Sequence, residues 1–113
     1  MSLDVYLTPN KCEHCGRGDE GFSSNITHNL GKMAAEAGIY EIVWRPEEHG
    51  ITKAKQLIEP LTKAVAEMEA DPVRFKKFDS DNGWGLYIHF LPWLKEYLAA
   101  CIAEPESSVS VSR

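Results

Sequence analysis

The sequence predicts a mainly α domain of the α+β class, with three to four helices and a small sheet. Two long segments, about residues 52–70 and 85–103, place apolar side chains at helical spacing. Residues 2–8 alternate between apolar and polar side chains, which is typical of a strand. A chain of 113 residues supplies one modest core, so we expect residues 1–103 to form a single globular domain. Residues 104–113 then form either a tail or an edge strand.

The N-terminal strand is predicted because Leu3, Val5 and Leu7 fall on one side of an extended chain. Residues 9–21 follow it and combine glycine, proline and charged residues, which predicts a loop. The strand therefore leads into a connection before the first helix begins.

The first helix is predicted from about Asn25 to Ala37. Ser24 or Asn25 can cap its N-terminus, and Gly38 is placed to end it. Gly31, in its middle, lowers helix stability by roughly 1 kcal/mol relative to alanine. A helix with this composition needs a functional explanation.

The middle of the chain is less regular. Residues 40–44 are a short apolar run, either a strand or an extended link, and Pro46 biases Arg45 away from helix and predicts a turn. The helix predicted for residues 52–70 has one complete apolar stripe. Pro60 lies inside that stripe and predicts a kink or a break.

The last third of the chain begins with Asp71 and Pro72, which predict the start of a short helix. Residues 79–85 are a turn cluster that precedes the final helix, which ends near Ala103. In the tail, valines alternate with serines over residues 108–112. This pattern fits a final strand beside residues 2–8 and fits a disordered tail equally well.

The predicted first helix has three faces on a helical wheel. The core face contains Ile26, Leu30, Met33 and Ala37. The polar face contains Asn25, His28, Asn29, Lys32 and Glu36. A third face of small residues contains Thr27, Gly31, Ala34, Ala35 and Gly38, and leaves the backbone open to close approach. A solvated polar face with a packed small-residue face is one interpretation. The other is a ligand site, because short polar side chains near a helix N-terminus suit a phosphate or a ribose.

Three further residues are candidates for ligand contact. Arg45 could bind a phosphate through both guanidinium nitrogens, and Trp44 could either stack on a base or belong to the core. Trp84 lies between two glycines and follows Asn82, so it is placed either to stack on a planar ligand or to fill the core.

The last helix is too apolar to bury only one face. Besides its core stripe it carries a second apolar strip made of Leu86, Phe90, Trp93 and Tyr97. A domain of this size has difficulty burying both, which predicts a homo-oligomer with Phe90, Trp93 and Tyr97 partly at the interface. His89 is then at the edge of a site or of that interface.

Charge and hydropathy exclude several functions. The net charge of -5 argues against binding extended nucleic acid, which needs clustered cations. No run of about 18 apolar residues is present, so we expect no membrane span. The N-terminus lacks a basic segment followed by an apolar one, so we expect no signal peptide.

The three cysteines indicate a reducing compartment rather than a disulfide framework. Cys12 and Cys15 have the spacing of half a zinc site, and the missing ligands would have to come from His28, His49 or Cys101. We expect free thiols here and no cofactor, with zinc as the alternative.

The segments Asn25–Met33, Trp44–Glu48 and Asn82–Gly85, with the closing VSVSR, resemble a family of short, mostly uncharacterised bacteriophage proteins. The resemblance covers nearly the whole chain. It implies a phage origin and action in the cytoplasm of the bacterial host. Small phage proteins without a catalytic motif often counter host defence, and by analogy one way is to sequester the nucleotide signals that the defence makes.

The leading hypothesis is therefore a small oligomeric protein that sequesters a nucleotide-like ligand without turnover, as counter-defence. The residues expected to bind the ligand are Asn25, His28, Asn29, Lys32, Trp44, Arg45, Asn82 and Trp84. One alternative is a metal-dependent phosphodiesterase or nuclease that uses His28, His49 and Glu47. Another is a protein–protein interaction module that docks through the last helix.

Overall fold

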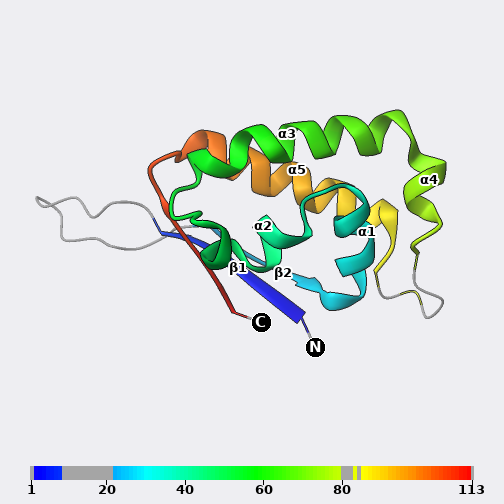
Figure 1. Cartoon of the computed structure of the whole chain (residues 1–113), viewed down its shortest axis with the longest axis horizontal. Coiled ribbons are helices and arrows are strands. Elements are labelled where there is room, and N and C mark those ends of the chain that lie inside the picture. Colours follow the sequence, from blue (N-terminus) through cyan, green and yellow to red (C-terminus); the bar gives the residue numbers. More distant parts are fainter. Residues whose placement is uncertain (1, 9–21, 80–82, 84, 113) are drawn as a thin grey trace, which may run out of the picture.

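A computed structural model describes residues 2–8, 22–79, 83 and 85–112, and it shows helices packed on one face of a small sheet (Figure 1). The sheet has three antiparallel strands in the order β2-β1-β3. Its central strand is β1 (Ser2–Thr8), flanked by β2 (Phe22–Thr27) and β3 (Ser108–Ser112). The tail is thus a strand beside the N-terminal strand, and the predicted α+β class is confirmed.

The inner face of the sheet is apolar because each strand alternates. Leu3, Val5 and Leu7 of β1 are buried, as predicted. Val5 lies opposite Ser24 of β2 and Val111 of β3, so neighbouring side chains from all three strands point toward the helices.

The predicted start of the first helix is wrong. Residues 25–27 belong to β2, a single 3-10 turn covers His28–Leu30, and helix α1 (Gly31–Glu36) follows. The physical reason is the sheet: Ile26 pairs with Leu3, and the backbone hydrogen bonds of the ladder replace those of a helix. Ile26 is buried as expected, but as a strand residue.

The next segment is helical where a strand or an extended link was predicted. Helix α2 (Tyr40–Trp44) follows Gly38, which ends α1 with a φ of 78° as expected. The predicted turn after it is one 3-10 turn, η2 (Pro46–His49). Val43 is buried on α2, so a short amphipathic helix serves the core here.

Helix α3 (Lys55–Ala70) passes through Pro60 without a break, contrary to one of the two outcomes expected for this residue. Pro60 removes a single helical hydrogen bond, the one to the carbonyl of Gln56. The Gln56 side chain holds the helix start, because its Oε1 accepts from the backbone N–H groups of Thr52 and Lys53 at 2.7 and 2.9 Å.

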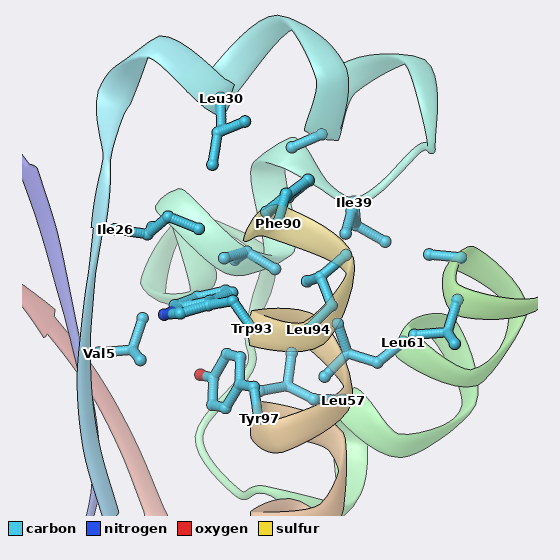
Figure 2. Packing of buried hydrophobic residues seen from close by; sticks show 14 of the residues in the cluster. Val5, Ile26, Leu30, Ile39, Leu57, Leu61, Phe90, Trp93, Leu94 and Tyr97 are labelled. Carbon is cyan, nitrogen blue, oxygen red and sulfur yellow. The ribbon is translucent and has the colours of Figure 1, made fainter. Parts of the chain in front are cut away.

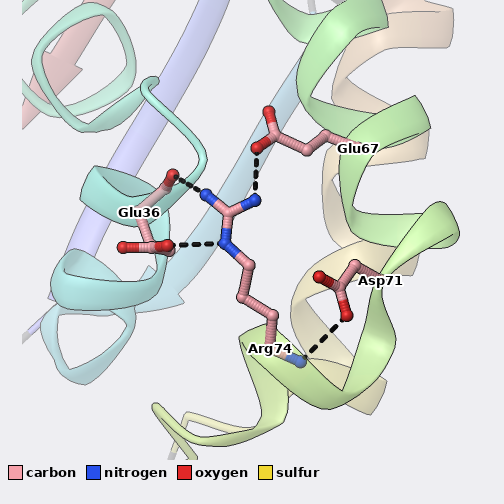
Figure 3. Close-up of polar contacts among 4 residues, drawn as sticks. All are labelled: Glu36, Glu67, Asp71 and Arg74. Carbon is pink, nitrogen blue, oxygen red and sulfur yellow. Dashed lines mark hydrogen bonds and ion pairs between the residues drawn. The ribbon is translucent and has the colours of Figure 1, made fainter.

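Helix α4 (Pro72–Lys76) is tied to its neighbours by Arg74 (Figure 3). Its Nε donates to Glu36 Oε2 of α1 at 2.6 Å, and one terminal nitrogen donates to Glu67 Oε1 of α3 at 2.7 Å. These hydrogen bonds, with Glu36 the larger cause, raise the pKa of Arg74 above its ordinary value. Asp71 caps α4 as predicted, accepting from the Arg74 N–H at 3.4 Å.

Helix α5 (Tyr87–Ala103) lies between the sheet and α3 (Figure 2). Both of its apolar strips are therefore used inside one chain. Phe90 and Tyr97 are fully buried and Trp93 is 8% exposed, whereas Ile88, predicted for the core stripe, is 60% exposed. The assignment of Phe90, Trp93 and Tyr97 to a subunit interface is wrong, because all three are buried inside one chain. Trp44 of α2 packs against Phe90, and Phe22 of β2 stacks on Tyr97.

Aromatic rings form a continuous series through this core. The rings, in order of contact, are Tyr40, Trp44, Phe90, Trp93, Tyr97 and Phe22, with neighbouring centroids 5.3–6.4 Å apart. Such pairs stabilise a core beyond the area that they bury. The series links α2, α5 and β2 into one packed unit. Within the described ranges, no helix is both long and apolar enough to span a membrane.

We expect stability to fall at alkaline pH because of three buried acids on α5, Tyr87, Tyr97 and Cys101. Burial raises the pKa of the Cys101 thiol from 9.0 to about 12, and burial followed by the nearby Cys101 raises the pKa of Tyr97. Burial is also the first cause that raises the pKa of Tyr87. The unfolded chain releases these protons from about pH 9 upward, whereas the folded chain keeps them. The free energy of unfolding should therefore be unaffected by them below about pH 8 and decrease progressively between about pH 9 and 12. Urea denaturation across this range measures it.

The control for this pH dependence is Cys101→Ala in a background with Cys12 and Cys15 replaced by serine. That variant should show a shallower alkaline decrease than the background protein, because one of the three protonated groups is gone. Equal slopes in both proteins would show that Cys101 does not contribute.

Candidate functional site

The structure places the predicted ligand residues on two sides of the segment that joins β2 to α1. One side is a hollow of about 570 Å³, here called the Asn25 hollow. Its lining residues are Ser2, Asn25, Ile26, Thr27, Leu30, Gly83, Gly85 and His89. Gly83 and Gly85 of the predicted turn cluster thus line the same hollow as Asn25, while Asn82 and Trp84 lie outside the described residues.

The Asn25 side chain is hydrogen-bonded within the sheet. Its Nδ2 donates to Asp4 Oδ1 at 2.6 Å and to Ser2 Oγ at 2.8 Å across the β1–β2 pair. Asn25 was expected at a helix N-terminus, where the dipole would favour an anion. It is on a strand, so that reason no longer applies to it.

The second side is a groove around Tyr40 made of two hollows of about 350 and 320 Å³. The hollows share Ala35 and Tyr40, and we call them together the Tyr40 groove. Its lining residues are His28, Gly31, Lys32, Ala35, Gly38, Tyr40, Glu41, Ile42 and His49. Each hollow is at the lower end of the size range of small-molecule sites.

The small-residue face of α1 forms one wall of this groove. A Cβ added at Gly31 would lie 3.2 Å from Tyr40 Cε1, so a side chain there would press on the ring. Ala35 is exposed and lines both hollows. The small-residue face of α1 was predicted to allow another group to approach the helix backbone closely. Tyr40 is that group, and the hollow beside its ring remains open.

Trp44 is a core residue, and its predicted role as a stacking platform for a ligand is wrong. It is 1% exposed and stacks on Tyr40 with an interplanar angle of 17°. Its Nε1–H donates to His28 Nδ1 at 2.9 Å. Trp44 therefore contacts two groove residues, Tyr40 and His28, from the core side and is too buried to stack on a ligand.

Two predicted cations are near the groove. Lys32 is exposed, and no described residue forms an ion pair with it. Arg45 pairs with Glu48 at 2.8 Å, and hydrogen bonds with Glu48 and then Tyr40 raise its pKa above the ordinary value. Lys32 is thus available to an anion, while Arg45 is held against the Tyr40 side chain.

Asn29 approaches Gly85 closely, and it lines neither the Asn25 hollow nor the Tyr40 groove. Its backbone N–H donates to Thr27 Oγ1 at 3.3 Å, which caps the 3-10 turn. Thr27, rather than Ser24 or Asn25, is therefore the capping residue. The expected contact of Asn29 with a ligand receives no support from this placement.

The groove does not resemble a metal centre. His49 Nε2 pairs with Glu41 Oε2 at 2.8 Å, and His28 is occupied by Trp44. Over the part of the chain that the structure describes, no cluster of three His, Cys, Asp or Glu side chains could hold an ion. Cys101, a suggested zinc ligand, is fully buried, and Cys12 and Cys15 lie outside the described residues.

Tyr40 and Glu41 line the groove but were not among the predicted site residues, and His49 was named only for the zinc and phosphodiesterase alternatives. Tyr40 was treated as part of an apolar run, and Glu41 and His49 are brought together only by the turn after α2. The available signal was the small-residue face of α1, which indicated that another group would approach it.

Comparison with known proteins yields no relative: no family model, curated protein or solved structure matches the chain.

Proposed function

We propose that this chain is a small phage protein that binds a nucleotide-like signalling molecule of its bacterial host in the Tyr40 groove. It holds the ligand without turning it over and so removes the signal from the host's defence. The observation that carries this proposal is Lys32, with which none of the described residues forms an ion pair, beside His28 and the Tyr40 ring. A cation, a hydrogen-bonding imidazole and an aromatic ring are the groups that a nucleotide requires.

The two halves of the groove suit different parts of such a ligand. The half with His28 and Lys32 supplies positive charge for a phosphate. The other half contains Glu41, whose carboxylate accepts hydrogen bonds and suits ribose hydroxyls or a base amine. Tyr40 lies between them, with Trp44 on one face of its ring and the groove beside it.

The contacts of the two groove histidines bear on the phosphodiesterase alternative. His49 is paired with Glu41 and His28 accepts a hydrogen bond from Trp44, so each imidazole has a neighbour that restricts it. The phosphodiesterase alternative requires His28, His49 and Glu47 to act together on a metal. The two imidazoles belong instead to separate contacts.

We expect Lys32→Ala to weaken nucleotide binding by about 10- to 100-fold, because a charge-assisted contact to phosphate is lost. Equilibrium dialysis against a panel of cyclic and linear nucleotides, with mass spectrometry of both fractions, measures retention and any chemical change. Retention of an intact nucleotide supports sequestration. A changed mass would overturn binding without turnover, and no retained nucleotide would overturn the function itself.

Two matched variants make this test specific to the groove. Lys77→Ala removes an exposed lysine next to α4 and should leave the affinity unchanged. Ala35→Leu should fill the groove from an exposed helix position, where leucine is a good helix former, and should abolish binding while the fold remains intact. A nucleotide that binds Ala35→Leu as well as the wild type would place the site elsewhere.

Self-association remains part of the proposal, through a different surface from the one first predicted. Ile88 and Ile102 are 60% and 57% exposed on α5 and lie on the same side of that helix. An oligomer that covers this strip would explain two large apolar side chains in water. Light scattering of the wild type and of Ile88→Glu measures this, and a wild-type monomer would remove it.

A further inference from the structure

The hydrogen bond between Trp44 and His28 determines which nitrogen of His28 carries a proton. An indole N–H can only donate, so His28 Nδ1, at 2.9 Å from Trp44 Nε1, must be the acceptor and carry no hydrogen. In a neutral imidazole the single proton is then on Nε2. Trp44 is rigidly placed for this task, because it is buried between Tyr40 and Phe90.

We infer that Trp44 is a positioning residue that holds His28 as a hydrogen-bond donor at Nε2 toward the Tyr40 groove. Among the described residues, none accepts a hydrogen bond from Nε2, and His28 lines the groove beside Lys32. The ligand group at this point must be an acceptor, and beside a lysine that acceptor is a phosphoryl oxygen. This inference rests on the proposed function and names the part of the ligand that His28 meets.

The same bond disqualifies His28 as a metal ligand or a general base. A histidine that binds a metal uses an unprotonated nitrogen and donates its other N–H to an acceptor. His28 has the reverse arrangement, since its partner is a donor. Its Nε2 has no lone pair to offer while the Trp44 bond exists. The tautomer thus distinguishes a phosphate-binding site from a metal-dependent hydrolase.

Two-bond proton–nitrogen NMR of the histidine rings tests the tautomer directly in the full chain, at about pH 8, where imidazoles are normally neutral. The expected result is a protonated Nε2 and an unprotonated Nδ1 for His28. Zn²⁺ added to the wild type should leave the His28 signals unchanged. A proton on Nδ1, an average of both tautomers, or Zn²⁺ binding at His28 Nε2 would overturn the inference.

Trp44→Phe is the matched variant, because it keeps an aromatic ring between Tyr40 and Phe90 and removes only the donor. It should release His28 into a mixture of tautomers and allow Zn²⁺ to shift the His28 signals. If Trp44→Phe fails to fold, the wild-type spectrum alone decides the point.

The ligand contact is tested with inorganic phosphate and two replacements of His28. The amide nitrogen of glutamine reaches about as far as Nε2, so His28→Gln keeps the outer donor, whereas His28→Asn keeps only the inner position near Trp44. We expect His28→Gln to bind phosphate nearly as well as the wild type and His28→Asn about tenfold less. Equal binding by both, or no phosphate binding by the wild type, would overturn the assigned contact.

The experiments distinguish a failure of this inference from a failure of the proposed function. A nucleotide that is retained in dialysis and is insensitive to His28→Asn would overturn this inference and leave sequestration standing. A panel with no retained nucleotide would overturn sequestration, and the histidine spectrum would still decide the role of Trp44.

Discussion

Replacing Phe90 with alanine is expected to lower the free energy of unfolding by about 3–5 kcal/mol, the range for a buried aromatic side chain. Phe90 is fully buried and packs against two other rings, Trp44 at 6.4 Å edge-on and Trp93 at 6.1 Å nearly parallel. Its removal leaves a cavity in the centre of the aromatic series, which rigid neighbours cannot fill. Urea denaturation followed by circular dichroism measures the change.

The control is Val73→Ala, on α4 and outside the α5 strip proposed for self-association. Val73 is 70% exposed, so its truncation should change the free energy of unfolding by no more than about 0.5 kcal/mol. The pair compares a core side chain with a solvated one. If Phe90→Ala were as stable as Val73→Ala and only changed the oligomeric state, Phe90 would be a subunit contact and the packing described here would be wrong.

Replacing Gly85 with alanine is expected to destabilise the protein by about 2–4 kcal/mol, from two independent causes. Gly85 has a φ of 105°, a backbone conformation that residues with a side chain rarely adopt. A Cβ there would also lie 2.9 Å from Asn29 Cβ and 3.3 Å from Thr27 Cγ2. The turn before α5 would have to move away from the end of β2, which would also alter the Asn25 hollow. Thermal and urea denaturation measure the loss.

Gly83→Ala separates the two causes. Gly83 also has a positive φ, 79°, but no atom of the described residues lies within 4 Å of a Cβ built there. It should therefore cost only the backbone strain, about 1–2 kcal/mol. Equal losses for the two variants would mean that the contact with Asn29 and Thr27 adds nothing and that this close approach is not a constraint on the fold.

Long segments with a strong local pattern were predictable from the sequence. The apolar stripe of α3 is buried at Leu57, Leu61 and Met68 as expected, because a stripe at helical spacing can only be covered by packing it on a core. The alternation of β1 predicted its buried face in the same way. Asp71 and Pro72 predicted the start of α4, since capping and the fixed φ of proline act within a few residues.

Short segments depended on partners far away in the sequence. Residues 25–27 carry no strong preference, and pairing with β1 made them a strand. Residues 40–44 are apolar enough for a strand, yet they form α2, whose Val43 and Trp44 are buried in the core. For the tail, only the free edge of β1 decides between a strand and disorder, because each strand needs a neighbour to satisfy its backbone.

The candidate site divides in the same way between sequence and tertiary structure. By itself, the sequence determined that His28 and Lys32 are polar side chains beside a bare helix face, because both features lie within one short segment. Only the tertiary structure decided that Asn25 belongs to the sheet and that Trp44 lies beneath Tyr40 and His28 rather than against a ligand. It also placed α5 between the sheet and α3, which buries Phe90 and Tyr97 inside one chain. Local periodicity records which side chains avoid water, but what covers them depends on elements that are distant in the chain.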